Sequence, residues 1–411
     1  MKHRFAAEVD AQYRSRHEAL LNRPRRCGLQ QLVVTATDSI YYLTDATCEP
    51  LERPFFLVID AATRSRRLLV PLLEQRHMLK GWGADEASIQ AYREFPAPAG
   101  EGWADALGDM VRSEFAFEPG TPYEVAQKLS SLGGRPMDLL EGMRIIKSPW
   151  EIRQIERAAE YADWGVQQIL RASYYGATVA EGYTAANALL RKIVKQEPEF
   201  DALATKVIAA PWPAPLSSDP HSVPKVDMLL REGPHVAMVL TRVNGYAAES
   251  ERTFFTAPPS GSEQSMFSLM EEARKLAFGL VRPGVACAEI DASVNAYLGK
   301  EGFADCQTRL HRVGHGFGLG NHEPPWIAEG SGHVLATNMV ISIEPGLYQQ
   351  GLGGYRHSDT VLATADGYRT LTKAPRELQQ LVLGKASMGQ RLKGFAVKSA
   401  LGMGRAREHK C

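Results

Sequence analysis

One short segment of the chain, residues 311–325, combines histidine and glycine in a way that suits chemistry, with the sequence HRVGHGFGLGNHEPP. Glycine allows backbone to approach backbone or ligand closely, and histidine supplies a proton switch near neutral pH and a metal ligand. We therefore predict a cleft wall into which imidazoles, including those of His315 and His322, point. A phosphate-binding glycine loop would need a following helix, which Pro324 and Pro325 exclude. A purely structural glycine turn remains an alternative.

Three acidic residues and one further histidine could share that cleft. Glu249 and Glu251 are two positions apart, so strand alternation would place both carboxylates on one side. Glu344 ends the apolar run 340–343, and His221 lies in a proline-bounded loop. Carboxylates beside histidines serve general acid–base catalysis or bind a divalent ion. The alternatives are that Glu249 faces solvent and that His221 is a surface histidine in a turn.

Two domains of mixed α/β structure, in an α+β arrangement, are predicted to position these residues. Short apolar runs at 32–34, 55–59 and 68–70 are typical of buried strands in a first domain, residues 1–146. A capping box marks the boundary, with Ser148 as the N-cap, Pro149 in the first turn and Glu151 three residues after the cap. The second domain, 147–385, is predicted to contain helices at 151–172, 179–196, 262–281 and 286–300 and strands at 205–210, 235–241, 251–256, 338–344 and 357–364.

Composition narrows the classes of function. The 411 residues include 47 Lys and Arg and 47 Asp and Glu, a balance that argues against a general nucleic-acid-binding protein. The five cysteines form no C-x-x-C motif and the N-terminus has no apolar signal-peptide core, so we expect a cytoplasmic protein with reduced thiols. No run of 18 apolar residues occurs, and we expect no membrane span. The basic tail, 386–411, is predicted to be a partly disordered, solvated segment or a contact for an acidic partner.

The segment 311–325 resembles the motif H-x-x-G-H-G-x-G-L-x-x-H-E-P-P of the pita-bread family, which includes aminopeptidase P, prolidase, methionine aminopeptidase and creatinase. Residues 146–152 resemble the I-K-S-P-x-E-I stretch with which that family's catalytic domain begins. The resemblance covers residues 10–380. It implies a creatinase-type N-terminal domain (1–146), a pita-bread catalytic domain (147–385) and a homodimer.

The resemblance also implies a site for two metal ions with five ligands: two Asp, one His and two Glu. His315 and Glu344 match their positions, and Glu249 stands where the second Asp is expected. The other two positions fall on Met238 or Val239 and on Ser358. Two ions bring about four positive charges, which several carboxylates must offset. We therefore expect no metal cofactor, with a single divalent ion on His315, Glu344 and Glu249 as the alternative.

Several of these departures resemble creatinase, a metal-free member of the family. Our leading expectation is a metal-independent, creatinase-like hydrolase that cleaves a C–N bond of a small zwitterionic amidino, amide or cyclic amidine substrate. By this resemblance Glu251 holds a cationic group, His221 transfers protons, and Arg53 reaches the partner's cleft to bind a substrate carboxylate. The expected catalytic residues are His221, Glu251, His315 and Glu344. The expected substrate-binding residues are Arg53, His322, Glu249, Arg356 and His357.

Other functions remain open at this point. One is an Xaa-Pro metallopeptidase, similar to aminopeptidase P or prolidase, with an altered metal site; His322, Glu323 and Arg356 favour it. Another is a non-catalytic pita-bread module that binds a peptide, and a ring-opening or lyase reaction would be an alternative to hydrolysis. As partners we expect a small-molecule substrate and a second copy of the chain, and neither nucleic acid nor a membrane.

Overall fold

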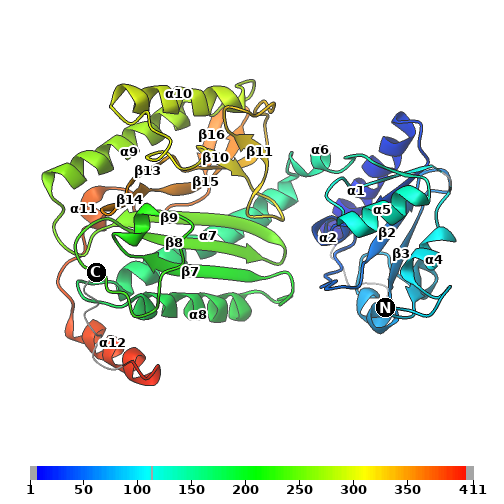
Figure 1. The fold of residues 1–411 in the computed structure, drawn as a ribbon, viewed down its shortest axis with the longest axis horizontal. Helices are drawn as coiled ribbons and strands as arrows, with labels where there is room; N and C mark the ends of the chain where they lie inside the picture. Colours follow the sequence, from blue (N-terminus) through cyan, green and yellow to red (C-terminus); the bar gives the residue numbers. More distant parts are fainter. Residues whose placement is uncertain (1–6, 113, 404–411) are drawn as a thin grey trace. The chain divides into compact units, whose positions relative to one another are not determined.

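The computed structural model describes residues 7–112 and 114–403. Its internal contacts divide the chain into two compact units, Met1–Arg144 and Ile145–Cys411, which can be followed along the chain in Figure 1. Each unit contains a sheet and a buried apolar core of its own. Among the described residues, no helix is long and apolar enough to cross a membrane.

A six-stranded sheet in the order β4-β3-β2-β1-β5-β6 forms the N-terminal unit. Its strands are β1 (Gln31–Val34), β2 (Phe56–Asp60), β3 (Ser65–Pro71), β4 (Ile89–Tyr92), β5 (Phe115–Phe117) and β6 (Gly134–Pro136). The helices are α1 (Ala7–Arg26), α2 (Thr37–Thr44), η1 (Leu72–Glu74), α3 (Gln75–Met78), η2 (Glu86–Ser88), α4 (Trp103–Gly108), α5 (Tyr123–Ser131) and α6 (Glu141–Arg144). Alternate side chains of a strand share a face, and Val33, Phe56, Val58 and Leu69 are buried in one core. The apolar runs predicted as strands are therefore strands of this sheet.

An eight-stranded sheet is the centre of the C-terminal unit, with the order β11-β10-β12-β15-β9-β8-β7 and β16 paired to β15. Its strands are β7 (Lys206–Trp212), β8 (His235–Val243), β9 (Tyr246–Phe254), β10 (Gly314–Gly316), β11 (Glu323–Ile327), β12 (Val340–Ile343), β15 (Ser358–Thr364) and β16 (Gly367–Thr370). A separate pair is formed by β13 (Gly346–Gln349) and β14 (Gly353–Arg356). Asn244 and Gly245, both with positive φ, turn β8 directly into β9, as a two-residue hairpin loop requires.

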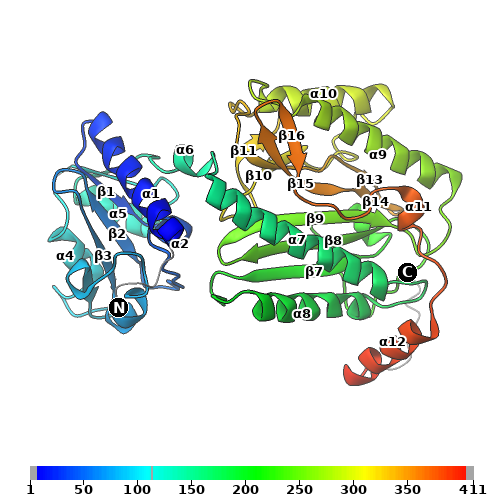
Figure 2. The ribbon, with the colours of Figure 1, turned by 180° about the vertical axis from the view of Figure 1, so that it is seen from behind.

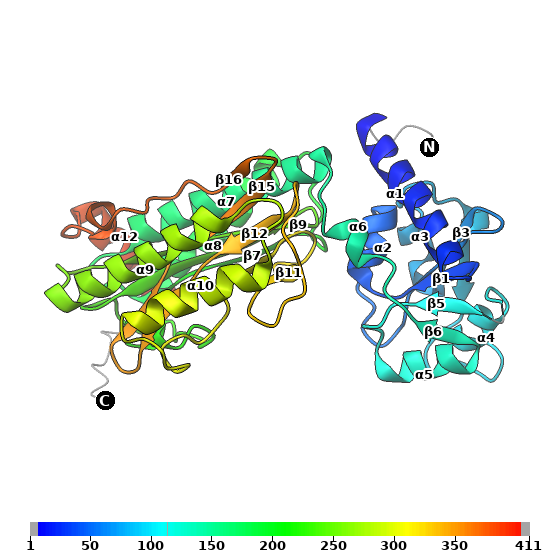
Figure 3. The ribbon, with the colours of Figure 1, turned by 90° about the horizontal axis from the view of Figure 1, so that it is seen from above.

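Helices flank this sheet. They are α7 (Pro149–Ala172), α8 (Val179–Gln196), η3 (Leu216–Ser218), α9 (Gly261–Leu280), α10 (Cys287–Lys300), α11 (Leu378–Leu381) and α12 (Met388–Ala400). Figure 2 shows α7 and α8 lying across β7, β8 and β9, and Figure 3 shows α9 beside α10. The start of α7 is the predicted capping box: Glu151 N donates to Ser148 Oγ at 3.2 Å, and Ser148 N donates to the Glu151 carboxylate at 2.9 Å.

The basic C-terminal segment contains α12, which corrects the expectation of a partly disordered tail. Lys398 Nζ lies 3.3 Å from Glu181 Oε1 on α8, and Gln390 Nε2 donates to the backbone oxygen of Arg171 at 2.9 Å. These contacts, with Ser387 as the N-cap, hold the helix against α7 and α8. Residues 404–411 lie outside the described residues, and contact of the tail with an acidic partner stays a prediction.

Candidate active site

Buried acidic and imidazole groups from neighbouring strands meet on one face of the C-terminal sheet. His315 of β10 lies with its Nε2 3.0 Å from Glu344 Oε1 and 3.7 Å from Glu249 Oε1. Glu344 directly follows β12, and Glu249 and Glu251 are both buried in β9. Glu344 and His315 lie near enough to affect the pKa values of both Glu249 and Glu251. The structure thus brings together Glu249, Glu251, His315 and Glu344, with the two residues of β9 on one side as strand alternation predicted.

Glycines in residues 311–325 let the strands close around His315. A Cβ atom at Gly314 would collide with the backbone oxygen of Ser342 on β12, and one at Gly316 would collide with that of Pro324 on β11. The close approach also lets Ser342 connect the backbone of β10 to the carboxylate of Glu344. Its Oγ accepts from His315 N at 2.9 Å and donates to Glu344 Oε1 at 3.1 Å. A side chain at either glycine would therefore move a ligand-bearing strand.

His322 forms the open side of this group. Its ring lies against that of His315, with centroids 3.8 Å apart and planes 33° apart. One ligand atom each from Glu249, His315 and His322 lies within 4.8 Å of the other two. His322 is exposed whereas the other two are buried. A molecule that enters from solvent would therefore meet His322 before it reached His315.

Burial and mutual repulsion set the protonation of these groups. Burial, with repulsion by Glu344, raises the pKa of Glu249. Burial also raises the pKa of Glu251, although Arg356 opposes it. For His315 burial disfavours the cation, but Glu249 and Glu344 outweigh this effect and raise its pKa. Burial opposes ionisation of Glu344 too, yet the charge and hydrogen bond of His315 lower its pKa. The cluster therefore carries excess negative charge that a proton on His315 partly offsets.

A second chain of contacts runs from Glu251 to the motif histidine His311. Arg356 Nε lies 2.5 Å from Glu251 Oε2, and Arg356 NH1 donates to Tyr348 Oη at 3.1 Å. Tyr348 Oη is 2.6 Å from His311 Nε2. Burial lowers the pKa of His311 to about 4, so its ring is neutral at pH 7. The guanidinium of Arg356 is thus held between the carboxylate of Glu251 and the hydroxyl of Tyr348.

Two positions where the pita-bread pattern has acids lie on either side of Glu251. Met238 of β8 and Ser358 of β15 are its direct partners in the two adjoining antiparallel pairings. Ser358 Oγ donates to Glu249 Oε1 at 2.5 Å. Val239 instead packs toward Gly165 of α7, so Met238, and not Val239, occupies the ligand position. An apolar side chain and a hydroxyl therefore stand where two carboxylates were expected.

Comparison with known proteins identifies the family to which the chain with this site belongs. Residues 153–365 match the family model described as Metallopeptidase family M24, and residues 16–146 match the Creatinase/Prolidase N-terminal domain. The chain belongs to metallopeptidase family M24.

Relatives of this M24 protein include peptidases of similar length. A probable dipeptidase PepE of Mycobacterium tuberculosis is 29% identical over 381 residues, which cover 91% of this chain and 97% of the relative. A Xaa-Pro dipeptidase of Pyrococcus furiosus is 34% identical over 242 residues, covering 59% of this chain and 67% of the relative. The crystal structure of dipeptidase PepE from Mycobacterium ulcerans superposes with a TM-score of 0.76 at 26% identity, covering 90% of this chain and 98% of that one.

These matches confirm some predictions and overturn one. The creatinase-type N-terminal domain followed by a pita-bread domain is confirmed, as is a hydrolase of this family acting on a C–N bond. The expectation of a metal-independent, creatinase-like hydrolase is wrong, because the relatives are named as dipeptidases and the family is one of metallopeptidases. The loss of acids at positions 238 and 358 suggested that no metal binds. It did not account for donors that remain close together around His315.

The residues present fit one divalent ion. Glu249, His315 and His322 offer ligand atoms within 4.8 Å of one another, and Glu344 lies beside His315. Imidazole and carboxylate are ordinary ligands for zinc and other divalent transition metals. The carboxylates of Glu249 and Glu344 would balance one such ion. A second ion would add two positive charges at a place where Met238 and Ser358 supply no carboxylate, so the donor set does not fit a pair.

Three predicted site residues lie elsewhere or at the margin of this M24 site. His357, which directly precedes β15, points away from the cluster: its Nδ1 lies 2.9 Å from Glu271 Oε1 and its ring packs on Phe267 of α9. That placement corrects its expected role in substrate binding, since neighbours in a strand face opposite sides. Arg53 is paired with Glu94 in the N-terminal unit. His221 is exposed after η3 and lies near enough to affect the pKa values of His311 and His322.

Several residues of the site escaped the sequence analysis. Lys147 is fully buried, and its Nζ lies 3.0 Å from Glu323 Oε1 beside the loop that carries His322. Tyr348 connects Arg356 to His311. The lysine of the I-K-S-P stretch was a usable signal, because a lysine in an apolar surrounding needs a buried acid as its partner. Tyr348 had no such signal, because its contacts depend on how β13 and β14 pair.

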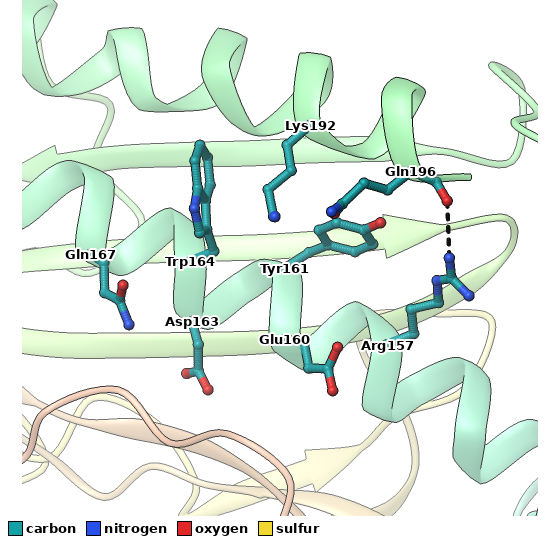
Figure 4. A pocket seen from close by; sticks show the side chains of 8 residues that line it. All are labelled: Arg157, Glu160, Tyr161, Asp163, Trp164, Gln167, Lys192 and Gln196. Atoms are coloured by element: carbon teal, nitrogen blue, oxygen red, sulfur yellow. Dashed lines mark hydrogen bonds between the residues drawn. The ribbon is translucent and has the colours of Figure 1, made fainter. Parts of the chain in front are cut away.

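A separate hollow of about 600 Å³ lies on the outer side of α7 and α8. Its lining includes Arg157, Asp163, Trp164 and Lys192; Figure 4 shows these side chains projecting from the two helices. Asp163 is already engaged, since it accepts from Ser250 Oγ at 3.0 Å and from the backbone N–H of Ala374 at 3.0 Å. None of the predicted site residues lines this hollow, so it is distinct from the His315 cluster.

Proposed function

We propose that the protein is an Xaa-Pro-type dipeptidase that works with one divalent metal ion, held by Glu249, His315 and Glu344. One observation carries the proposal. Within an M24 domain, Glu344 Oε1 and Glu249 Oε1 lie 3.0 and 3.7 Å from His315 Nε2, and His322 offers a ligand atom within 4.8 Å of those of Glu249 and His315 from the solvent side. The relatives named Xaa-Pro dipeptidase and dipeptidase PepE support a small peptide as the substrate. This function is the altered-metal-site alternative that His322, Glu323 and Arg356 favoured in the sequence.

When bound, the ion would polarise the scissile carbonyl and lower the pKa of a water molecule. The protein side chains supply the remaining functions. Burial and the nearby charge of His315 lower the pKa of His322 to about 4, so the neutral ring can donate a hydrogen bond to the oxygen on which charge develops. His221, exposed near this opening, is proposed to contact the substrate. Both rings meet the peptide at the open side of the cluster.

Hydrogen bonds within the protein orient the proposed ligands. Ser342 Oγ donates to Glu344 Oε1, and Ser358 Oγ donates to Glu249 Oε1. Such outer contacts fix the direction of a ligand's lone pairs, and their loss typically lowers metal affinity or activity by about 10–100-fold. The pair Lys147–Glu323 anchors the loop that presents His322, because Gly320 N also donates to Glu323 Oε2 at 3.2 Å. The site is thus oriented before substrate arrives.

A metal-dependence assay tests the proposal. Protein stripped by a chelator and reloaded with Mn²⁺, Co²⁺ or Zn²⁺ is assayed on Xaa-Pro dipeptides and on matched Xaa-Ala dipeptides. We expect hydrolysis only after reloading, with the larger kcat/KM for the proline series. H315A should lose both metal and hydrolysis, whereas H333A, outside the cluster, should keep both. Hydrolysis that survives chelation, or that H315A leaves intact, would contradict the proposal.

We further propose a cytoplasmic homodimer in which Arg53 binds the substrate carboxylate in the partner's cleft. Arg53 is part-exposed and held by Glu52 and Glu94, so its guanidinium is oriented by carboxylates that a substrate carboxylate could replace. Cys27, Cys48, Cys287 and Cys306 are free thiols, which fits a reducing compartment. Light scattering should give the mass of two chains. R53A should raise KM for a free dipeptide but not for one with an amidated C-terminus; equal effects on both would exclude this role.

A further inference from the structure

Helix α12 lies at the edge of the C-terminal unit, beside α8, as Figure 1 and Figure 2 show. One face of this helix is fixed to the fold. Gln390 Nε2 donates to a backbone oxygen in the last turn of α7 at 2.9 Å, and Lys398 Nζ lies 3.3 Å from Glu181 Oε1. Gly394, midway between them, is buried, and a Cβ atom there would collide with the carboxylate of Glu181. The helix therefore contacts α7 and α8 through positions 390, 394 and 398.

The opposite face of α12 is apolar and exposed. Met388, Leu392 and Phe395 follow the spacing that places side chains on one helix face, and they are 79%, 63% and 70% exposed. Positions two apart in an α-helix differ by about 200° around its axis, so Leu392 points away from Gly394 and from α8. Single exposed apolar residues are ordinary, but these three form a continuous stripe. Within residues 7–112 and 114–403, no part of the chain covers it.

The charge of α12 is complementary to an anionic surface. The helix has three bases, Arg391, Lys393 and Lys398, and no acid, whereas the whole chain has equal numbers of basic and acidic residues. Lys398 is engaged with Glu181. Arg391 and Lys393 are exposed, and each lies about 100° around the axis from Leu392, on opposite sides of it. Positive charge that flanks an apolar stripe is typical of helices that lie on anionic membranes.

Two other occupants of the stripe fit less well. A second copy that met α12 about a two-fold axis would present the same surface, so Arg391 and Lys393 of both chains would repel one another. A protein groove receives the apolar face of an amphipathic helix together with its flanks. Because α7 and α8 already cover the inner side of α12, a flat surface that contacts only the outward face is the better fit.

We propose that α12 binds an anionic lipid bilayer, with Met388, Leu392 and Phe395 below the headgroups and Arg391 and Lys393 beside the lipid phosphates. Apolar burial and attraction to anionic lipid both contribute to the binding of such a helix. We expected no membrane partner because no run of 18 apolar residues occurs, but a helix that lies on a surface requires no such run. The inference is independent of the peptidase function.

Sedimentation of the full-length protein with lipid vesicles tests the inference. The protein is mixed with sucrose-loaded vesicles of phosphatidylcholine alone or of an equal mixture with phosphatidylglycerol, and we expect it to sediment with the anionic mixture. L392S/F395S should weaken this binding about tenfold or more, and R391Q/K393Q about fivefold for each base removed. The matched controls are L72S/L73S, an equally exposed apolar pair, and R191Q/K195Q, an exposed basic pair on α8. Both should bind as the wild type does.

Several results would overturn the inference. Sedimentation that does not depend on phosphatidylglycerol, or that both α12 variants leave unchanged, would contradict it. No sedimentation with either kind of vesicle would favour an acidic protein as the partner. Light scattering of L392S/F395S without lipid should give the same mass as the wild type, and a smaller mass would show that a second copy covers the stripe. If L392S/F395S fails to fold, R391Q/K393Q, which changes exposed side chains only, provides the test.

Discussion

The sheet around β9 and β15 has a cluster of buried charge on each face, and the two clusters are built in opposite ways. On the helix-facing side the carboxylate of Asp359 is surrounded by the guanidiniums of Arg252, Arg274 and Arg376. On the other side the carboxylates of Glu249, Glu251 and Glu344 face one guanidinium, that of Arg356. Neighbouring residues of β9, Glu251 and Arg252, contribute to different clusters, because alternate positions face opposite sides.

The difference separates a structural cluster from a binding site. Both oxygens of Asp359 are fully used: Oδ1 accepts from Arg252 at 2.7 Å, Thr372 at 2.8 Å and Arg376 at 2.9 Å, and Oδ2 accepts from Arg376 at 3.0 Å and from Arg274. Burial opposes ionisation, but Arg252 and Arg274 lower the pKa of Asp359. The other cluster instead has carboxyl groups with raised pKa values. Only that side has charge left for a ligand.

Removing the acid from the structural cluster should have the largest effect. D359N leaves Arg252, Arg274 and Arg376 without their shared anion in a buried position. We expect the free energy of unfolding to fall by about 3–5 kcal/mol, measured by denaturant titration. D366N, on an exposed turn after β15, should change it by less than about 0.5 kcal/mol. A D359N protein as stable as the wild type would show that the two clusters do not differ in this way.

Acidification should weaken the proposed metal site steeply. In the metal-free protein the pKa values of His315 and Glu249 are both raised, so binding an ion must release the protons that these groups hold. Release of one to two protons corresponds to about a ten- to hundredfold loss of affinity per unit fall in pH. Calorimetry at pH 6, 7 and 8 in buffers of different ionisation enthalpy measures this release. Binding without proton release would contradict the account of these pKa values.

Neutralising an acid in the binding cluster should stabilise the metal-free protein. A carboxyl whose pKa is higher in the folded state favours folding while protonated, and this benefit is lost as pH rises from the unfolded pKa through the folded one. At pH 8, E249Q should therefore raise the free energy of unfolding of metal-free protein by about 1 kcal/mol while abolishing the ion-dependent gain. E199Q, at an exposed position, serves as the control. If E249Q instead destabilised the metal-free protein, the Glu249 cluster would be a structural cluster like that of Asp359.

The smallest expected change in stability comes from replacing Ser358, the serine that contacts Glu249. Ser358 Oγ donates to Glu249 Oε1, so S358A should lower the free energy of unfolding by about 0.5–1.5 kcal/mol and leave the ion count unchanged. S358E would restore a carboxylate at this position. It should lower the stability of metal-free protein and raise metal affinity, which sharpens the contrast between the two faces. An S358A variant that bound no ion would mean that Ser358 itself is a ligand.

Much of the fold was predictable because local signals agreed with the packing. The helix predicted at 179–196 is α8 with the same bounds, and the capping box of Ser148 and Glu151 begins α7. The alternation that placed Glu249 and Glu251 together needed no knowledge of other strands. His315 and Glu344 could also be predicted as site residues, because each lies in a short, distinctive segment of the sequence.

The remaining site could not be predicted, because it depends on strand register. Nothing near Glu251 in the sequence indicates that Met238 and Ser358 lie opposite it, or that Arg356 approaches through β14. His357 was misplaced because it lies one residue before Ser358, and neighbouring residues of an extended segment face opposite sides. The mistaken metal-free function has the same origin. Missing ligands were visible in the sequence, whereas the closeness of the retained donors is a property of the fold.

Anomalous X-ray diffraction from crystals soaked with Mn²⁺ would test the central claim most directly. We expect one anomalous peak per chain, in contact with Glu249, His315 and Glu344, and the guanidinium of Arg356 still on Glu251. Two peaks at the site, a peak that displaces Arg356, or a peak away from His315 would contradict it.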